Sequence, residues 1–243
     1  MKEQLEVVDE AVPYILLQRT ETQSKLRKLR YILPKGRQIY NKVYNGFLYR
    51  LEAQLRGDEV KEEYLDKLEE EYRWLKPYLP ENPDRLLDIG CGVGGLELFL
   101  SEHYEEVKPE YYLLDKTEVS EQVYYQFEDK GAYYNSLQVA NEMLKENEVD
   151  EGRIRLLEVE QTEVKDLPPV DLCFSFLSWA FHYPLSTYLD EVLQILKPEG
   201  RLILDFRRET GERAECSRCF EEEEVIKKTD KYTRTMFRGP REI

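Results

Sequence analysis

The sequence has few cysteines, few histidines and no long apolar run, and each shortage excludes a class of protein. Four cysteines in 243 residues are too few for a disulfide framework. The pair Cys216 and Cys219 has neither a second cysteine pair nor a nearby histidine to complete a zinc site. No apolar stretch approaches the roughly 18 residues of a transmembrane helix. The first residues carry acids where a secretion signal has bases, so we expect a cytoplasmic protein that binds neither metal nor membrane.

Positive charge is also scarce, and much of it gathers in one segment. The chain has 35 Lys and Arg against 50 Asp and Glu, which argues against general nucleic-acid binding. Residues 19–50, however, hold nine bases and one acid, so this segment carries +8 and leaves −23 on the rest of the chain. Two interpretations stay open: a solvated helix face, or a basic arm that meets an anionic substrate or docks on the acidic body.

The apolar pattern predicts a helical N-terminal part followed by an alternating α/β part. Residues 1–57 predict a helical cap or lid that ends at Gly57, and 58–243 predict the main domain. A long amphipathic helix runs from Val60 to Leu75. Strands and helices then alternate, which indicates a parallel sheet covered on both faces. The expected strands are 85–89, 111–114, 154–159, 170–176, 201–206, 222–226 and 232–237, and the expected later helices are 95–103, 137–144 and 188–196.

Residues 86–95, LLDIGCGVGG, are the strongest sign of a ligand site. They follow a strand, are rich in glycine and open a helix, as a nucleotide-binding turn requires. Gly90 and Gly92 permit a tight turn and a close approach of the backbone to a ligand. Asp88 repels a pyrophosphate but suits a ligand with an ammonium or sulfonium group. Asp115 follows the last glycine by twenty residues and can accept hydrogen bonds from both ribose hydroxyls. Together these residues indicate a nucleoside with a cationic tail.

This segment resembles motif I of the class I S-adenosylmethionine-dependent methyltransferases, and the resemblance covers roughly residues 70–240. It implies a Rossmann-like α/β fold with a seven-stranded, mostly parallel sheet, an antiparallel last strand, and S-adenosylmethionine (SAM) as cofactor. Shorter stretches, 134–137, 178–184 and 204–207, are similar to a bacterial group described as sugar O-methyltransferases. The positions that match the family's cofactor contacts are Asp88, Gly90, Cys91, Gly92, Asp115, Glu160, Gln161, Thr162 and Ser175. Which of residues 160–162 contacts the adenine stays open.

The acceptor is expected near the loop after the fourth strand, whose end faces the reacting methyl group in the family. Methyl transfer from a sulfonium is an in-line displacement with the acceptor held about 3 Å from the methyl and water excluded. His182 lies in this loop, and an imidazole can accept a hydroxyl proton near neutral pH. A structural role before Pro184 is the alternative. The substrate-contact candidates are Trp179, Phe181, Tyr183, Arg207 and Arg37, with some of the aromatic residues expected in the core.

The expected function is therefore methyl transfer from SAM to a small-molecule hydroxyl, with a sugar or sugar phosphate as a candidate acceptor and His182 as base. Asp205 is a further residue within reach of the acceptor, unless it forms an ion pair. Two alternatives stay open: an RNA or DNA methyltransferase that uses the basic segment 19–50, and a SAM-binding protein without catalysis. Residues 175–177 lack the Asp/Asn-Pro-Pro-aromatic signature of amino-directed base methylation.

Overall fold

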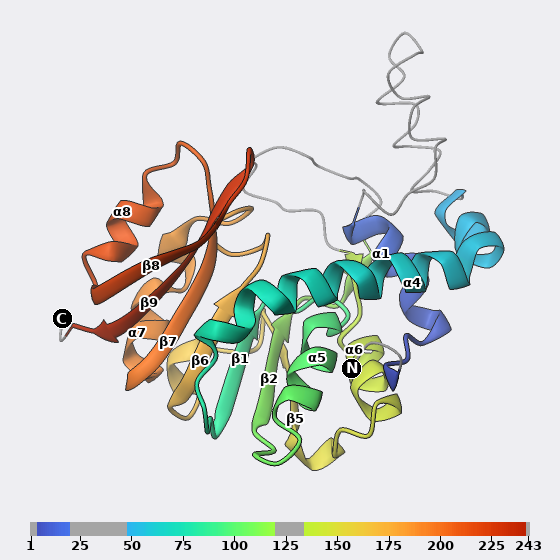
Figure 1. Cartoon of the computed structure of the whole chain (residues 1–243), viewed down its shortest axis with the longest axis horizontal. Coiled ribbons are helices and arrows are strands. Elements are labelled where there is room, and N and C mark those ends of the chain that lie inside the picture. The colour runs from blue at the N-terminus through green and yellow to red at the C-terminus, as the bar shows by residue number, and fades with distance from the viewer. Residues whose placement is uncertain (1–3, 20–47, 120–133, 242–243) are drawn as a thin grey trace, which may run out of the picture.

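A seven-stranded sheet organises the chain in our computed structural model, which describes residues 4–19, 48–119 and 134–241 (Figure 1). The strands lie in the order β5-β2-β1-β6-β7-β9-β8, and the antiparallel pairings of this sheet are those of β9 with β7 and β8. The prediction of a mostly parallel sheet with one antiparallel strand is confirmed. The strands are β1 (Arg85–Ile89), β2 (Glu110–Asp115), β5 (Ile154–Glu158), β6 (Val170–Ser175), β7 (Leu196–Arg207), β8 (Phe220–Lys228) and β9 (Tyr232–Pro240), and a separate short pair is formed by β3 (Glu118–Val119) and β4 (Tyr134–Asn135).

Helices cover both faces of the sheet, as the alternating pattern predicts. Figure 1 shows α4 and α5 in front of the strands, with α7 behind them. The α-helices of the described ranges are α1 (Val12–Gln18), α4 (Tyr49–Leu75), α5 (Gly95–His103), α6 (Leu137–Glu146), α7 (Leu189–Ile195) and α8 (Glu212–Ser217), and the short 3-10 helices are Asp9–Ala11, Lys76–Tyr78, Glu151–Arg153, Val164–Asp166 and Leu185–Thr187. Within these ranges no helix combines the length and the apolar character needed to cross a membrane.

The sheet separates two apolar cores, because neighbouring residues of a strand point to opposite faces. In β1, Leu86 joins the core beneath α4 and α5, whereas Leu87 joins the core that contains the buried residues of α7. The central strands are therefore held on both sides. Their carboxyl ends meet along one edge of the sheet, where the predicted nucleoside site lies.

The long helix α4 bends close to the predicted helix boundary. The sequence pattern predicts that one helix ends at Gly57 and another begins near Val60. In the structure Arg56 has non-helical backbone angles (φ −129°, ψ 19°), so α4 consists of two helical segments that meet at this bend. The predicted boundary between 1–57 and 58–243 lies next to it. The second segment joins the apolar core through a buried stripe that includes Val60, Tyr64, Leu65, Leu68, Tyr72 and Leu75.

The strand β7 also begins earlier than the expected position 201. It starts directly after α7, pairs Leu196 with Val170, and resumes regular pairing at Arg201 opposite Leu172. Residues 197–200 therefore bulge out of the strand instead of separating it from the helix. Lys197 fixes this bulge by ion pairs to Asp84 (2.6 Å) and Asp171 (2.8 Å).

Candidate cofactor and acceptor site

The glycine-rich turn after β1 is held against the neighbouring strand ends. Gly90 donates its N–H to the Leu114 carbonyl of β2 (2.7 Å). Its φ is +83°, a conformation that favours glycine, and a Cβ on it would overlap the Ser178 side chain. Gly90 therefore brings the loop after β6 into direct contact with the turn, as a site shared by cofactor and acceptor requires.

Asp115, at the end of β2, closes the turn from the other side. Its Oδ2 accepts the Gly92 N–H (2.8 Å) and its Oδ1 accepts the Lys116 N–H (2.7 Å). Burial raises the pKa of Asp115 to about 6, and the Glu158 charge adds to this effect, although the two backbone donors oppose it. Each carboxylate oxygen has a second lone pair. Asp115 therefore keeps the acceptor capacity that the ribose-binding role predicts for it.

Asp88, near the end of β1, faces a second acid that the sequence reading missed. Asp88 is 7% exposed and Glu97, in the first turn of α5, is 1% exposed. Burial, followed by the neighbouring Glu97, raises the pKa of Asp88 well above its ordinary value. Neither Glu97 oxygen has a hydrogen-bond donor among the described residues. The signal for Glu97 was present in the sequence as a single acid inside the apolar run Leu96–Leu100.

These three acids fit the cofactor that the family resemblance implies. Asp88 and Glu97 are buried and form no ion pair within the described parts of the chain. An unpaired buried carboxyl group is costly unless a cation or a donor satisfies it. A nucleoside that carries an ammonium and a sulfonium supplies such cations, and its ribose supplies donors for Asp115. Cys91 lies beside them in the turn, buried, with its thiol pKa raised well above the ordinary value by burial.

The predicted adenine contacts lie in the turn after β5, next to the end of β2. Asp115 stands opposite Glu158 in the strand register, and the turn follows directly. Glu160 forms an ion pair with Lys116 (2.9 Å), Gln161 is exposed and Thr162 is half-buried. This turn therefore borders the Asp115 side of the edge, and its contact with an adenine stays a prediction.

Two residues predicted to touch the ligands serve the fold instead. The Ser175 hydroxyl is fully buried, donates to the Ile89 carbonyl (2.5 Å) and accepts the Trp179 N–H (2.9 Å). Ser175 is therefore a link between β6 and β1 and not a cofactor contact. The Trp179 side chain is also completely buried and donates its indole N–H to the Leu185 carbonyl (2.9 Å). Trp179 consequently belongs to the core and does not form a wall of an acceptor site.

The loop after β6 presents His182 beside Phe181 and Arg207. Leu177 and Ala180 have φ values of +55° and +62°, which marks a strained backbone of the kind found at functional sites. The His182 imidazole reaches the surface and has no hydrogen-bond partner within the described ranges. Partial burial against the loop, and then the Arg207 charge, lower the pKa of His182 below its ordinary value.

Arg207 lies beside the same aromatic ring. Its guanidinium is 5.9 Å from the centre of the Phe181 ring, and the His182 and Phe181 rings meet edge to face. Tyr183 is half-buried at the end of this loop. The structure thus brings His182, Phe181 and Arg207 together, whereas Arg37 lies outside the described residues.

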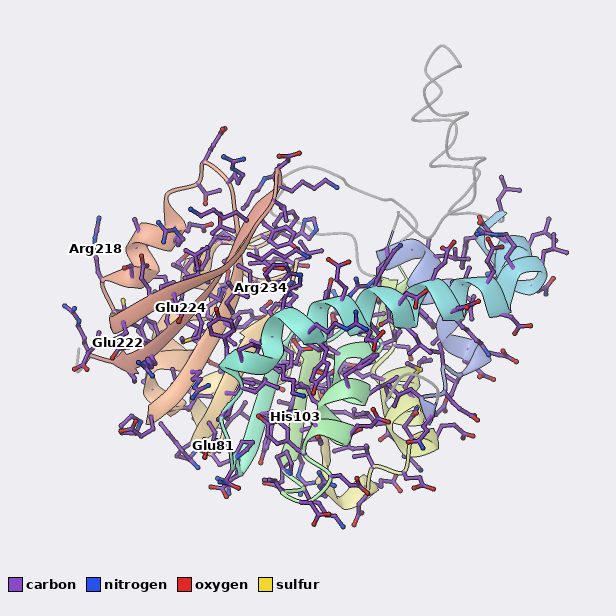
Figure 2. All side chains as sticks on the ribbon, in the orientation of Figure 1. Glu81, His103, Arg218, Glu222, Glu224 and Arg234 are labelled. Carbon is purple, nitrogen blue, oxygen red and sulfur yellow. The ribbon has the colours of Figure 1, made fainter. Side chains whose placement is uncertain are left out.

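Asp205 pairs with a residue that the sequence reading did not single out. Arg234 of β9 donates Nε and Nη2 to the two Asp205 oxygens at 2.7 and 2.8 Å, and both side chains are 0% exposed. The Arg234 guanidinium also stacks on the Phe176 ring, 3.6 Å from its centre. Figure 2 shows Arg234 inside the molecule, whereas Arg218 and Glu222 lie at its outer edge. Asp205 is therefore committed to this pair and does not reach an acceptor.

The end of α1 lies over the glycine-rich turn, at the border of the basic segment. The Gln18 side chain would contact a Cβ on Gly92 and donates to Asn135 Oδ1 (3.3 Å). Arg19 pairs with Glu71 of α4 (3.2 Å) and lies over the Tyr64 ring. The described end of the N-terminal part thus packs against the glycine-rich turn and α4, and its role as a lid stays a prediction.

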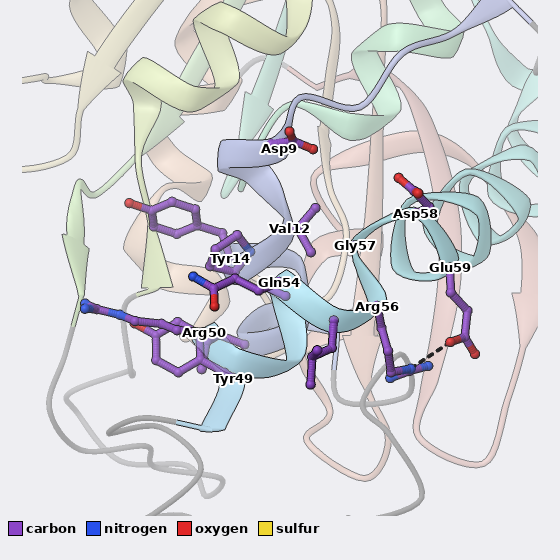
Figure 3. A pocket seen from close by; sticks show the side chains of 14 residues that line it. Asp9, Val12, Tyr14, Tyr49, Arg50, Gln54, Arg56, Gly57, Asp58 and Glu59 are labelled. Atoms are coloured by element: carbon purple, nitrogen blue, oxygen red, sulfur yellow. Dashed lines mark hydrogen bonds and ion pairs between the residues drawn. The ribbon is translucent and has the colours of Figure 1, made fainter.

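Two hollows lie outside the acidic edge. One, of about 730 Å³, is formed by α1 and the bend of α4, with Tyr14, Tyr49 and Arg50 among its walls (Figure 3). None of the strand-tip acids lines it. The other, of about 410 Å³, is lined by Arg208, Arg213, Lys228, Thr229, Asp230 and Thr233. This basic hollow begins one residue after Arg207, so it adjoins the side of the edge that holds His182.

The strand order defines the class of fold. The order β5-β2-β1-β6-β7-β9-β8 with antiparallel β9 is the arrangement that the resemblance to class I SAM-dependent methyltransferases implies, and the glycine-rich turn and Asp115 stand at the expected strand ends. The chain has the fold of this class.

Comparisons with known proteins add only distant likenesses. No protein-family model and no curated protein matches the sequence. A precorrin-6y C5,15-methyltransferase from Geobacter metallireducens is similar with a TM-score of 0.49 and 16% identity over 68% of this chain and 85% of that chain. A methyltransferase from Pyrococcus furiosus is similar with a TM-score of 0.49 and 14% identity over 70% and 81% of the two chains. The assignment of the fold rests on the strand order and not on these likenesses.

Proposed function

We propose that the protein transfers a methyl group from SAM to a hydroxyl group of an anionic small molecule. The observation that carries this proposal is the set of three acids, Asp88, Glu97 and Asp115, around a glycine-rich turn at the carboxyl ends of β1 and β2. When bound, SAM supplies a methyl group on a positively charged sulfur. The chain supplies negative charge for the cationic end and hydrogen-bond acceptors for the ribose.

The acceptor side of the proposal rests on His182. An unbonded imidazole with a lowered pKa is neutral at pH 7, and a neutral imidazole can take the proton that an alcohol loses when its oxygen attacks. The Phe181 ring beside it contributes an apolar surface that helps to exclude water. His182 therefore has the protonation state and the position along the chain that the predicted base needs.

An anionic acceptor is favoured by the basic hollow next to Arg207. In the described parts of the chain Arg208 and Lys228 have no ion-pair partner, whereas Arg213 pairs with Glu223 (2.9 Å). Asp230 is the one acid among the six lining residues. In a protein with a net charge of −15, such a local excess of positive charge suits a phosphate or a carboxylate. A sugar phosphate combines such an anion with hydroxyl groups.

The test is methyl transfer from labelled SAM into fractions of a bacterial cell extract. We expect label in an anionic small molecule that an anion-exchange column retains. The double variant Arg208→Ala/Lys228→Ala raises the KM for this acceptor about tenfold and leaves SAM affinity unchanged, while Arg218→Ala, on the outer edge, changes neither. Label in RNA, DNA or protein, or in no fraction, contradicts the proposed acceptor class.

A further inference from the structure

Glu97 is an acid that has no partner of opposite charge among the residues that the structure describes. It lies in the first turn of α5 among apolar residues of the same helix, and 1% of its surface is exposed. Both of its carboxyl oxygens lack a hydrogen-bond donor among the described residues. Within the described ranges, the acid in contact with it is Asp88 at the tip of β1. A buried acid whose polar side-chain partner is a second acid is retained at a cost, and this indicates that a cation from outside the chain completes the pair.

The described titratable groups that interact electrostatically with this carboxyl pair are acidic or weakly acidic. The titratable groups that face it are Asp115 and Tyr111 of β2, Cys91 of the turn, Cys173 of β6 and Tyr64 of α4. Arg19, which lies over the Tyr64 ring, is paired with Glu71. Two adjacent buried carboxyl groups without a cation cannot both be ionised, so they hold at least one proton between them.

We propose that Asp88 and Glu97 share a proton in the free protein and release it to solvent when the cationic methionyl end of SAM binds. This inference rests on the proposed function and adds Glu97 as a residue that determines cofactor specificity. The incoming positive charge replaces the proton, and the ionised pair then satisfies the cation. The exchange favours nucleosides with a positive charge at this end over nucleosides without one.

The exchange also makes SAM affinity depend on pH. Below the pH at which the pair loses its proton, binding that releases one proton strengthens about tenfold per pH unit. Asp115 also titrates, but it faces the ribose position, which charged and uncharged nucleosides share. Its contribution therefore cancels in the ratio of affinities for two nucleosides of different charge, whereas the contribution of Glu97 does not.

The experiment is isothermal titration of the full-length protein at pH 7 in phosphate and in Tris, two buffers that take up protons with different heats. SAM carries an ammonium and a sulfonium, S-adenosylhomocysteine carries the ammonium alone, and methylthioadenosine carries neither. The variants are Glu97→Gln, which keeps the shape of the side chain, and Glu105→Gln, an exposed acid just beyond α5. Asp88→Asn serves as the second test of the Asp88–Glu97 pair. Circular dichroism and thermal unfolding verify that each variant is folded.

For the wild type we expect release of about one proton per SAM bound. Binding of methylthioadenosine should release no proton. Proton release on binding of S-adenosylhomocysteine shows that the pair binds the ammonium, and absence of release shows that it binds the sulfonium. Glu97→Gln or Asp88→Asn should reduce proton release with SAM to near zero and lower the preference for SAM over methylthioadenosine at least tenfold, while Glu105→Gln retains the wild-type values. SAM binding without proton release, or equal release by Glu97→Gln, overturns the proton exchange and leaves the proposed function standing. If none of the three nucleosides binds, both the proton exchange and the proposed function are overturned.

Discussion

Buried acids at the carboxyl edge of this sheet differ in one respect, namely whether the chain supplies a cation for them. Asp205 has Arg234, with two hydrogen bonds in a completely buried pair. In the described parts of the chain, Asp88 and Glu97 have each other as partner and no cation. In the first arrangement the two charges satisfy each other, although Arg234 Nη1 has no hydrogen-bond partner among the described residues, and removal of one partner leaves a buried charge. The second is complete only when a proton or a ligand is present, which is the property expected of a binding site.

The Asp205–Arg234 pair yields a prediction for stability. Asp205→Ala leaves the Arg234 charge buried without its partner, so we expect the free energy of unfolding to fall by about 3–5 kcal/mol. Urea unfolding monitored by circular dichroism measures the loss. The double variant Asp205→Leu/Arg234→Met removes both charges and should recover most of the stability. A loss below about 1 kcal/mol for Asp205→Ala would show that the pair does not hold β7 to β9 in this way.

His182 yields a prediction for the pH dependence of turnover. Because burial and Arg207 lower its pKa below the ordinary value near 6.5, the neutral form that accepts a proton predominates at pH 7. We expect kcat to be constant above that pH and to fall as the pH drops through the lowered pKa. His182→Ala should reduce kcat about 100-fold, with SAM affinity unchanged. His103→Gln, at the only other histidine, should retain both the rate and the pH profile of the wild type. If His182→Ala also retains the wild-type pH profile, His182 is not the base.

At the scale of elements, the glycine-rich turn and the bend of α4 use glycine in different ways. Gly90 has a positive φ and no room for a side chain, because Ser178 packs against it. Gly57 has no atom within 4 Å of a Cβ placed on it and lies inside α4. The first glycine is required by its conformation and contacts, whereas the second only adds flexibility to the unfolded chain.

The two positions therefore predict opposite effects of the same substitution. Gly57→Ala should raise the free energy of unfolding by about 0.5–1 kcal/mol. Gly90→Ala should lower it by about 1–3 kcal/mol and weaken SAM binding, since the loop after β6 has to move away from the turn. Thermal and urea unfolding of the two variants side by side provide the comparison. If Gly57→Ala destabilises the protein, or Gly90→Ala is neutral, the described turn and bend are incorrect.

Elements with strong local signals could be predicted from the sequence. The apolar runs 85–89 and 170–176 coincide with β1 and β6 to within a residue, because each is bounded by turn residues and buried on both faces. The predicted helix end at Gly57 lies one residue from the bend at Arg56, where two helical segments of α4 meet. Residues 197–200 were read as a turn between elements because nothing local shows that they bulge out of β7.

The site residues that could be predicted are those that lie close together in one sequence motif or at one strand end. Asp88, Gly90, Gly92 and Asp115 stand in one motif or at one strand end, so their proximity follows from a parallel sheet. The pairing of Asp205 with Arg234 joins residues 29 positions apart and depends on the register of β9. Beyond the end of β6 the chain leaves the strand, and alternation no longer tells which side chains point inward. The core positions of Ser175 and Trp179 follow from the path of that loop.

At the scale of the whole molecule, the carboxyl edge of the sheet is divided by charge. The acids of β1, α5 and β2 occupy one part, while Arg207 and the basic hollow between the ends of β7, β8 and β9 occupy another. His182 lies in the loop between β6 and α7, on the basic side. This division suits a reaction in which a cationic donor and an anionic acceptor approach each other along one edge, each drawn to its own part by charge.

The central claim is that the strand-tip acids bind the sulfonium nucleoside, and calorimetric titration with SAM tests it most directly. We expect heat of binding at one site per chain for the wild type, and a loss of at least 100-fold in affinity when Asp88→Asn and Asp115→Asn are combined in a protein that remains folded. No heat with the wild type, or unchanged affinity in the double variant, contradicts the claim.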